Sequence, residues 1–328
     1  MDNRYIPLIE DFLKYIEDNI KDRHKIAERL AEITKTCKWF PMVFNIVVGM
    51  SAEDYILARV IAQSSRHLVR SNKTVTAIGK EYKFESQQTY SNTFANIVGV
   101  PPHIFRIERP YDKLLKPFVF DRNLLDGVNT DKVKVVELPP MNVASTYLYK
   151  SNSRQSKIRV TRDILEPRAW SKLLRWNMLN AYHFLLGYDM EKAPGIAKIS
   201  KFLVSQNYHL APYSRYFGFS NPLPSNGKEV GYEAWSMIYD NGKQPTSDEK
   251  DIVIKRFEGG LYAAVDVPEV SDGDVMIYWK AIHKWILDSE EYTYGDHQYL
   301  EEYLTIKNKG GFHGKIFYIP IKKISSGT

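Results

Sequence analysis

The spacing of apolar residues changes near residue 130, and this change limits the fold more than any other feature. Before about residue 108, apolar residues recur every three or four positions, as from Leu8 to Ile20 (LIEDFLKYIEDNI), which predicts amphipathic helices. From Val133 onward they occur in short runs bounded by Pro and Gly, which predicts strands. A chain of 328 residues has room for two or three domains. We therefore predict a multidomain protein with an all-α domain followed by an α+β domain.

The second part is predicted to contain the same set of elements twice. Residues 132–151 form a strand, a Pro139-Pro140 turn and a strand, and are followed by a helix near 168–187 and two strands within 215–240. Residues 251–268, with a Gly259-Gly260 turn, begin the same order again. The sequence thus predicts two successive strand-turn-strand, helix, strand-strand units. We expect domains at 1–108 and 131–328, joined by a linker at 109–130 that has no clear period.

Composition excludes several classes of protein. The net charge of +6 and the pI near 9.0 permit a nucleic-acid partner without requiring one. The single cysteine, Cys37, excludes an internal disulfide. The acidic N-terminus lacks signal-peptide features, and no apolar run approaches the roughly 18 residues of a membrane span, so we expect a cytoplasmic protein. The histidines have no metal-ligand spacing, and neither a phosphate loop nor a nucleophile elbow occurs. We expect no metal, no cofactor and no enzymatic activity.

One helix in the first part has the residues of a DNA reader. In the stretch FESQQTYSNTFANIVG, Ser86 is a natural N-cap, and the apolar positions from Tyr90 to Val98 form one face. Polar side chains are left on the first turns, where a helix in the major groove presents its readers. Amides pair with adenine edges, although amides are also common on solvated helix faces. The polar residues are Gln87, Gln88, Ser91 and Asn92.

This stretch resembles the second helix-turn-helix of AraC/XylS-type regulators, and of their Mar/Rob group in particular. The resemblance lies in FESQQTYSNTF (84–94) and GVPPHIFR (99–106), with a looser match from Phe44 to Arg59. It covers about residues 5–108 and implies a domain of two helix-turn-helix units that binds duplex DNA. The residues implied as DNA contacts are Lys38, Trp39, Arg59, Lys83, Ser86, Gln87, Gln88, Ser91 and Asn92.

The sequence departs from the family pattern at both reading helices. In the first unit, Pro41 and the apolar run Met42-Val43-Phe44 occupy positions where polar or basic readers are expected. Proline is tolerated only in the first turn of a helix, so this helix must begin near Phe40. In the second unit, Asn92 stands where relatives usually have a basic residue. We expect the first unit to serve mainly as scaffold, with phosphate contacts supplied by cations elsewhere, among them Lys35, Arg66 and Lys73.

The second part resembles the GyrI-like effector-binding domain. The matching segments are VKVVELPPMNVAST, RYFGFSNPLP with VGYEAWSMIYD, VIKRFEGGLYAAVDV, and YLEEYLTI with GKIFYIPI. The resemblance implies a cleft that binds amphipathic, often cationic, small molecules. Most of the Trp and Tyr residues lie after residue 109, and aromatic faces attract cations, although each also suits a core. Candidate ligand contacts are Tyr147, Tyr149, Trp170, Trp235, Tyr262 and Trp279, and, from a Glu-x-Tyr pattern, Glu301 and Tyr303.

Glu301 has two candidate roles. Within an aromatic cleft its carboxylate is expected to counter a bound cation, and a buried carboxylate can also act as a general base. The leading interpretation is a Rob-type transcriptional regulator that binds double-stranded DNA and a small-molecule effector, with RNA polymerase as a further candidate partner. The alternatives are a ligand-binding or hydrolytic GyrI-like protein whose DNA-binding domain is degenerate, and an interaction protein that engages RNA polymerase or another regulator.

Overall fold

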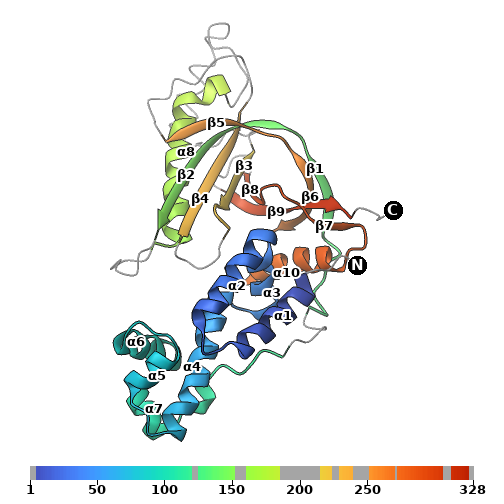
Figure 1. Ribbon diagram of the computed structural model, residues 1–328. Coiled ribbons are helices and arrows are strands. Elements are labelled where there is room, and N and C mark those ends of the chain that lie inside the picture. Colours follow the sequence, from blue (N-terminus) through green and yellow to red (C-terminus); the bar gives the residue numbers. More distant parts are fainter. Residues whose placement is uncertain are drawn as a thin grey trace. The chain divides into compact units, whose positions relative to one another are not determined.

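The computed structural model describes residues 5–119, 125–151, 160–184, 215–223, 229–238, 251–269, 272–305 and 312–324. The chain divides into two compact units, Asn3–Asp126 and Gly127–Thr328 (Figure 1). The first unit is helical and the second combines a large antiparallel sheet with helices. This confirms the predicted order of an all-α part followed by an α+β part. The exact domain boundaries stay a prediction.

The first unit is built from helices with well-defined N-caps. Ser51, Thr74 and Ser86 each accept a hydrogen bond from the backbone N–H three residues later, which satisfies a donor that the helix leaves free. Left-handed glycines follow two of the helices, at Gly49 and Gly99. The helices are α1 (Tyr5–Asp18), α2 (Arg23–Thr36), α3 (Phe40–Val48), α4 (Ala52–Arg70), α5 (Val75–Glu81), α6 (Gln87–Val98) and α7 (Pro102–Glu108).

Helix α3 begins at Phe40, as its proline requires. Pro41 therefore lies in the first turn, where the missing N–H removes no intrahelical hydrogen bond. The apolar residues of α3 serve the core: the ring of Phe12 in α1 lies edge-on to those of Phe40 and Phe44, and Phe44 lies edge-on to Tyr55 of α4. This packing agrees with the expectation that the first unit acts as scaffold.

The segment after α7 packs back onto the helices. A short 3-10 helix, Tyr111–Lys113, places the ring of Tyr111 edge-on to Phe105. Farther on, the N–H of Phe118 donates to the Tyr55 hydroxyl at 2.9 Å, and Arg59 Nη1 donates to the Leu115 carbonyl at 2.5 Å. Residues 111–118, expected as linker, are thus part of the helical unit's surface.

The second unit confirms the predicted repetition of elements. Within the described residues, its elements follow the order strand-strand, helix, strand-strand twice, with a short extra strand, β7, in the second repeat. The first repeat is β1 (Lys134–Leu138), β2 (Met141–Ser151), α8 (Arg162–Phe184), β3 (Tyr216–Ser220) and β4 (Glu229–Ile238). The second is β5 (Ile252–Phe257), β6 (Gly260–Val267), α10 (Asp272–Asp288), β7 (Tyr292–Tyr294), β8 (Leu300–Thr305) and β9 (Phe312–Lys323).

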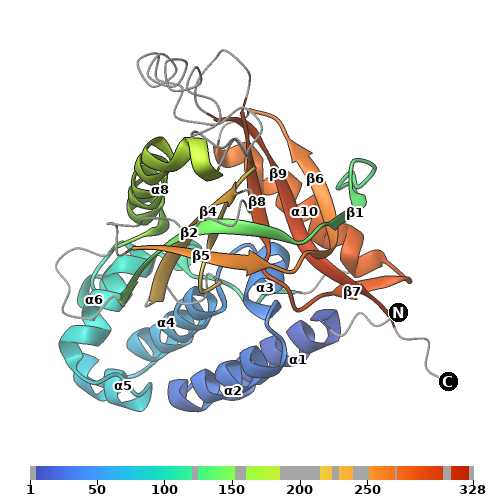
Figure 2. The ribbon, with the colours of Figure 1, turned by 90° about the horizontal axis from the view of Figure 1, so that it is seen from above.

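The sheet contains two places where the chain bends and passes directly from one strand into the next. Its order is β1-β6-β9-β8-β3-β4-β2-β5, and β7 pairs with β9. The chain bends at Pro139-Pro140 between β1 and β2, and at Gly259 between β5 and β6. The two bent segments lie antiparallel to each other, so that β1 pairs with β6 on one side of the bend and β2 pairs with β5 on the other (Figure 2). Gly259 has φ +79°, and an added Cβ would lie 2.3 Å from the Leu138 carbonyl oxygen, so the bend requires glycine.

Strand alternation assigns the sheet two distinct faces. Helix α8 covers one of them, where Trp170 packs on Tyr303. Helix α10 lies on the same face, because its Trp279 stacks on Phe317, which pairs across the ladder with Glu301. The opposite face carries a second buried set of aromatic residues, Phe217, Phe219, Trp235, Phe257, Tyr262 and Tyr318.

Among the described residues, no single helix is long and apolar enough to cross a membrane. Taken together, α3 and α4, which are bent by 52° at the break between them, pass the same test by length and composition.

Candidate functional site

Helix α6 presents its polar residues as the sequence predicts. Tyr90, Phe94 and Val98 are buried, and the Ser86 hydroxyl caps the helix by accepting from the N–H of Thr89 at 3.0 Å. Of the predicted polar residues on the first turns, Gln87, Gln88 and Asn92 are exposed and Ser91 is half-buried.

Two of the exposed amides are joined to each other. Gln88 Nε2 donates to Asn92 Oδ1 at 2.7 Å. The pair therefore keeps an acceptor, Gln88 Oε1, and a donor, Asn92 Nδ2, for a further partner. Gln87 differs, because its side-chain oxygen accepts from the Thr76 hydroxyl at 2.5 Å and links α6 to α5.

Several of the predicted cations are exposed on the surface of the helical unit. Lys35, Lys38, Arg66 and Lys83 are exposed. Lys73, in contrast, pairs with Glu81 at 2.6 Å, and Lys21 pairs with the same carboxylate at 2.7 Å.

Two of the residues predicted as DNA contacts are buried. Arg59 is buried. Its guanidinium donates two hydrogen bonds of 2.7 Å to the Glu17 carboxylate and a third to the Leu115 carbonyl. Trp39 is only 2% exposed, so its ring belongs to the core of the unit. Arg59 fits the family spacing, but spacing alone does not distinguish a residue that faces DNA from one that holds the scaffold together.

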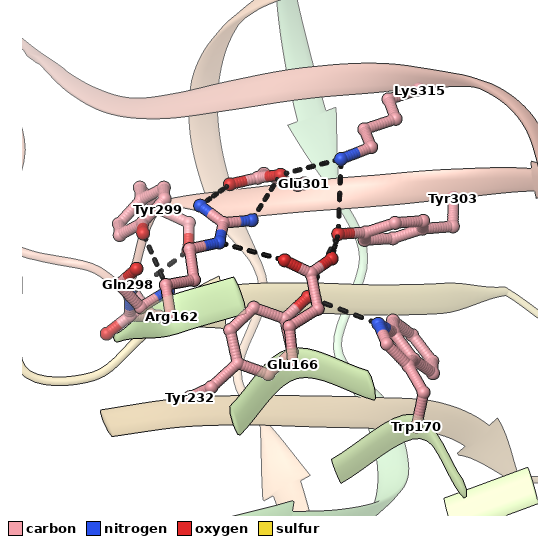
Figure 3. A network of polar contacts seen from close by, with 10 residues as sticks. Arg162, Glu166, Trp170, Tyr232, Gln298, Tyr299, Glu301, Tyr303 and Lys315 are labelled. Atoms are coloured by element: carbon pink, nitrogen blue, oxygen red, sulfur yellow. Dashed lines mark hydrogen bonds and ion pairs between the residues drawn. The ribbon is translucent and has the colours of Figure 1, made fainter. Parts of the chain in front are cut away.

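In the second unit, Glu301 is the centre of a buried polar cluster (Figure 3). Its carboxylate is 2% exposed and faces two cations: Arg162 Nη2 donates to Oε2 at 2.9 Å, and Lys315 Nζ lies 3.4 Å from the same oxygen. Glu301 Oε1 lies 2.7 Å from Arg162 Nη1, in an ion pair that lacks hydrogen-bond geometry. The side chains come from α8, β8 and β9, far apart in sequence.

A second carboxylate completes the cluster from α8. Arg162 Nε donates to Glu166 Oε2 at 3.0 Å, one helical turn along. Burial opposes ionisation of Glu166, but the Arg162 guanidinium and a hydrogen bond from Tyr303 outweigh it and lower the pKa of this carboxyl. Burial likewise opposes the charge of Arg162, yet Glu301 holds its pKa well above the ordinary value. Both groups are therefore charged, and they form a neutralised pair.

A chain of hydrogen bonds runs from Trp170 of α8 to two tyrosines of the sheet and returns to Glu166 of the same helix. Trp170 Nε1 donates to the Tyr232 hydroxyl at 3.2 Å, which lies 2.9 Å from the Tyr303 hydroxyl, and Tyr303 donates to Glu166. Burial raises the pKa of Tyr303 and of Tyr232 above the usual range of a phenol, so both remain protonated donors. The arrangement fixes the orientation of each ring beside the charged groups.

Four predicted ligand contacts lie on the opposite face of the sheet from Glu301, namely Tyr147, Tyr149, Trp235 and Tyr262. Tyr147 pairs across the ladder with Glu233, and Trp235 lies two residues farther along the same face. Their face is opposite to that of Tyr232, which contacts the cluster. Tyr262 lies on the ladder beside Tyr318, whose hydroxyl donates to Glu302. Residue type suggested all four, but the alternation of side chains along the strands places them on the other face of the sheet from Glu301.

The opposite face has a charged centre of its own. The buried Glu233 accepts hydrogen bonds from Ser145 and Trp235, both at 2.6 Å, and from Asn221 at 2.8 Å, and it also pairs with Lys255. Because several donors satisfy this carboxylate, it stabilises the fold of this face. Tyr149 is half-exposed at the end of the same strand as Tyr147.

The cluster therefore confirms the proximity of Glu301, Tyr303 and Trp170 and adds residues that the sequence did not single out. Trp279 lies on the same face but packs on Phe317 and Tyr299. The residues missed were Arg162, Glu166, Tyr232 and Lys315. Arg162 and Glu166 are four residues apart, a spacing that allows an ion pair on a helix. Nothing in the sequence relates them to Glu301, which lies 139 positions after Arg162.

Comparisons with known proteins assign relatives to each unit. Residues 183–321 match the family model for Cass2, described as an integron-associated effector binding protein. The multiple antibiotic resistance protein MarA of Salmonella typhimurium is 35% identical over 100 residues, which are 30% of this chain and 78% of MarA. The HTH-type transcriptional activator AarP of Providencia stuartii is 31% identical over 110 residues, 33% of this chain and 81% of AarP.

Solved structures similar to the chain include the EcmrR C-terminal domain. The TM-score is 0.34 at 15% identity, and the match covers 58% of this chain and 98% of that domain. The sequence identity to MarA and AarP, each matched over more than two thirds of its length, shows that the chain is related to them. The chain therefore belongs to the AraC family of transcriptional regulators.

Proposed function

We propose that this regulator binds duplex DNA through α6 and reads bases with the joined amides of Gln88 and Asn92. The observation that carries the proposal is their hydrogen bond, which leaves one acceptor and one donor pointing out from the first turns. An adenine edge in the major groove offers the complementary donor, N6–H, and acceptor, N7. The pair is held in place before DNA arrives, so less side-chain freedom is lost on binding.

The first helix-turn-helix is proposed to support the second one rather than to read bases. The only exposed residue of α3 is Asn45, and the helix contains no cation. Phosphate attraction would then come from exposed cations outside α3, among them Lys38, Arg66 and Lys83.

Selection of DNA sites tests the DNA half of the proposal. The full chain is incubated with a pool of random duplexes, and bound molecules are recovered by gel shift at low salt and at about 200 mM salt. We expect a recurring short motif whose binding weakens with salt. Recovery of unselected sequence at every round, or binding that is independent of salt, would overturn the proposal.

We further propose that the Glu301 cluster binds an amphipathic cationic effector. Glu301 is a nearly fully buried carboxylate surrounded by the rings of Tyr232, Tyr299 and Tyr303. Cations already lie over two aromatic faces: Arg162 is 5.2 Å from the Tyr232 ring centroid, and Lys315 is 4.5 Å from that of Tyr303. A site that holds cations against both a carboxylate and aromatic rings has the chemistry to bind a cationic ligand.

Ligand titration tests this half of the proposal. A lipophilic aromatic cation is expected to quench the tryptophan fluorescence of the full chain saturably. Glu301→Gln should weaken this cation far more than a neutral analogue of the same shape, whereas Glu258→Gln, an exposed carboxylate of the same unit, should change neither. Equal loss for cation and neutral analogue would contradict the charge role of Glu301, and a lack of saturable quenching by any such cation would contradict the site.

A further inference from the structure

The Glu301 cluster is electrically balanced before any ligand binds. It contains two carboxylates, Glu166 and Glu301, and two cations, Arg162 and Lys315. Arg162 pairs with both carboxylates, and Lys315 pairs with Glu301. A ligand that brought one more positive charge would leave this buried cluster with an uncompensated charge, which costs several kcal/mol in a protein interior. A cationic ligand therefore requires that one of the resident cations leave.

Arg162 is the resident cation whose position a ligand cation would need, because it contacts both carboxylates. It is the first residue of α8, and its guanidinium pairs with both Glu166 and Glu301. The side chains of Arg162 and Lys315 are equally exposed, at 32%, whereas the Glu301 side chain is 3% exposed. The guanidinium thus reaches from the surface into the cluster. Lys315 lies farther from Glu301, at 3.4 Å, and also contacts the Tyr303 hydroxyl at 3.3 Å and the face of the Tyr303 ring.

The contacts of Arg162 are those that a bound ligand would make. Its guanidinium carbon lies 5.2 Å from the Tyr232 ring centroid, and its nitrogens face Glu301 and Glu166 at 2.7–3.0 Å. Glu301 Oε1 accepts no hydrogen bond of good geometry. A ligand cation placed here could pair with the same two carboxylates. It could also donate a hydrogen bond to Glu301 Oε1, which the tethered arginine does not.

We propose that Arg162 is a resident cation that occupies the head-group position of the effector, and that the effector enters by exchange for it. The site therefore selects a planar cation with at least two N–H donors, such as a guanidinium or an amidinium carried on an apolar aromatic body. A quaternary ammonium lacks these donors and replaces Arg162 less well. This inference rests on the effector-binding function proposed above and specifies its ligand class.

The exchange makes Arg162 an internal competitor. A tethered group acts at an effective concentration on the order of millimolar, so its removal raises the affinity of any ligand that needs the same position. Removing the arginine should therefore strengthen the binding of cations, contrary to the effect expected for a residue that recognises the ligand directly.

Chemical rescue of Arg162→Ala tests the proposal in the full chain. We expect methylguanidinium, at millimolar concentrations, to raise the melting temperature of this variant saturably and to leave the wild type unchanged. Tetramethylammonium should have much less effect. Phenylbenzamidine should bind Arg162→Ala at least about tenfold more tightly than wild type, a difference of about 1.4 kcal/mol. The double variant with Glu301→Gln should lose both effects.

Arg168→Ala is the matched control, because this arginine lies on the same helix and is exposed. It should behave as wild type with every probe. If Arg162→Ala does not fold, Arg162→Lys keeps the charge but loses the planar fork, and it should still bind phenylbenzamidine more tightly than wild type. Equal or weaker binding by the Arg162 variant that folds would overturn the proposal. Rescue by methylguanidinium without binding of any larger cation would instead support the resident position of Arg162 and contradict the effector-binding function.

Discussion

At the scale of single residues, two arginines each bind a glutamate through two guanidinium nitrogens. Arg59 joins α4 to Glu17 of α1 and to the segment after α7, and Arg162 joins α8 to Glu301. The two guanidinium groups differ in exposure, at 4% for the Arg59 side chain and 32% for Arg162. The first is thus a structural element of the helical unit, while the second reaches the surface of its own unit.

Arg59→Ala should destabilise the helical unit. Loss of one partner from a buried pair costs about 3–5 kcal/mol, and partial exposure of Glu17 reduces this to about 2 kcal/mol or more. Denaturant unfolding of the full chain, followed by a probe of helix content, measures the change. Arg66→Ala, an exposed arginine of the same helix, is the control and should stay within about 0.5 kcal/mol of wild type. Equal stability of the two variants would contradict the structural role of Arg59.

At the scale of elements, Glu81 ties three parts of the helical unit together. It pairs with Lys21 before α2 and Lys73 before α5, and these hydrogen bonds lower its pKa to about 2 from a usual value of 4.5. A carboxyl whose pKa falls on folding stabilises the fold above its unfolded pKa, and this contribution is lost as pH falls. The unfolding free energy of wild type should thus decline between about pH 4.5 and pH 2 more steeply than that of Glu81→Gln. Glu28→Gln, an exposed carboxylate, should follow the wild type.

The bend at Gly259 gives a second test at this scale. Gly259→Ala introduces both left-handed strain and a clash with the Leu138 carbonyl, whereas Gly127 has φ +81° with nothing within 4 Å of an added Cβ. Gly127→Ala should cost about 1 kcal/mol from strain alone, and Gly259→Ala distinctly more. Thermal unfolding of both variants measures the difference. Equal costs would show that the sheet does not need the close approach at its bend.

The elements themselves could largely be predicted, and the sites only in part. The start of α3 follows from Pro41, and the repetition in the second unit follows from the order of strands and turns. The ligand contacts could not be predicted fully, because a shift of one residue along a strand places Trp235 or Tyr262 on the wrong face. The partners of Glu301 lie on other elements, and only the fold brings Arg162 to it.

At the scale of the whole molecule, one reading helix is expected to dominate contact with DNA. Helix α3 contributes to the core through Phe40 and Phe44, and α6 carries the exposed amides. Footprinting should show strong protection over about one helical turn of the site. Strong protection across two adjacent major grooves would show that α3 also docks. Contact with RNA polymerase stays a prediction from the family resemblance.

The most direct test of base reading by α6 is the ratio of affinities for a selected site and a scrambled duplex. Fluorescence anisotropy gives both constants for wild type, Gln88→Ala and Asn92→Ala, at the same salt. Each variant should lose about 1–3 kcal/mol on the selected site and little on the scrambled duplex. Asn96→Ala, an exposed amide on the last turns of α6, should leave the ratio unchanged. Equal losses on both duplexes would contradict the central claim that α6 reads bases through this amide pair.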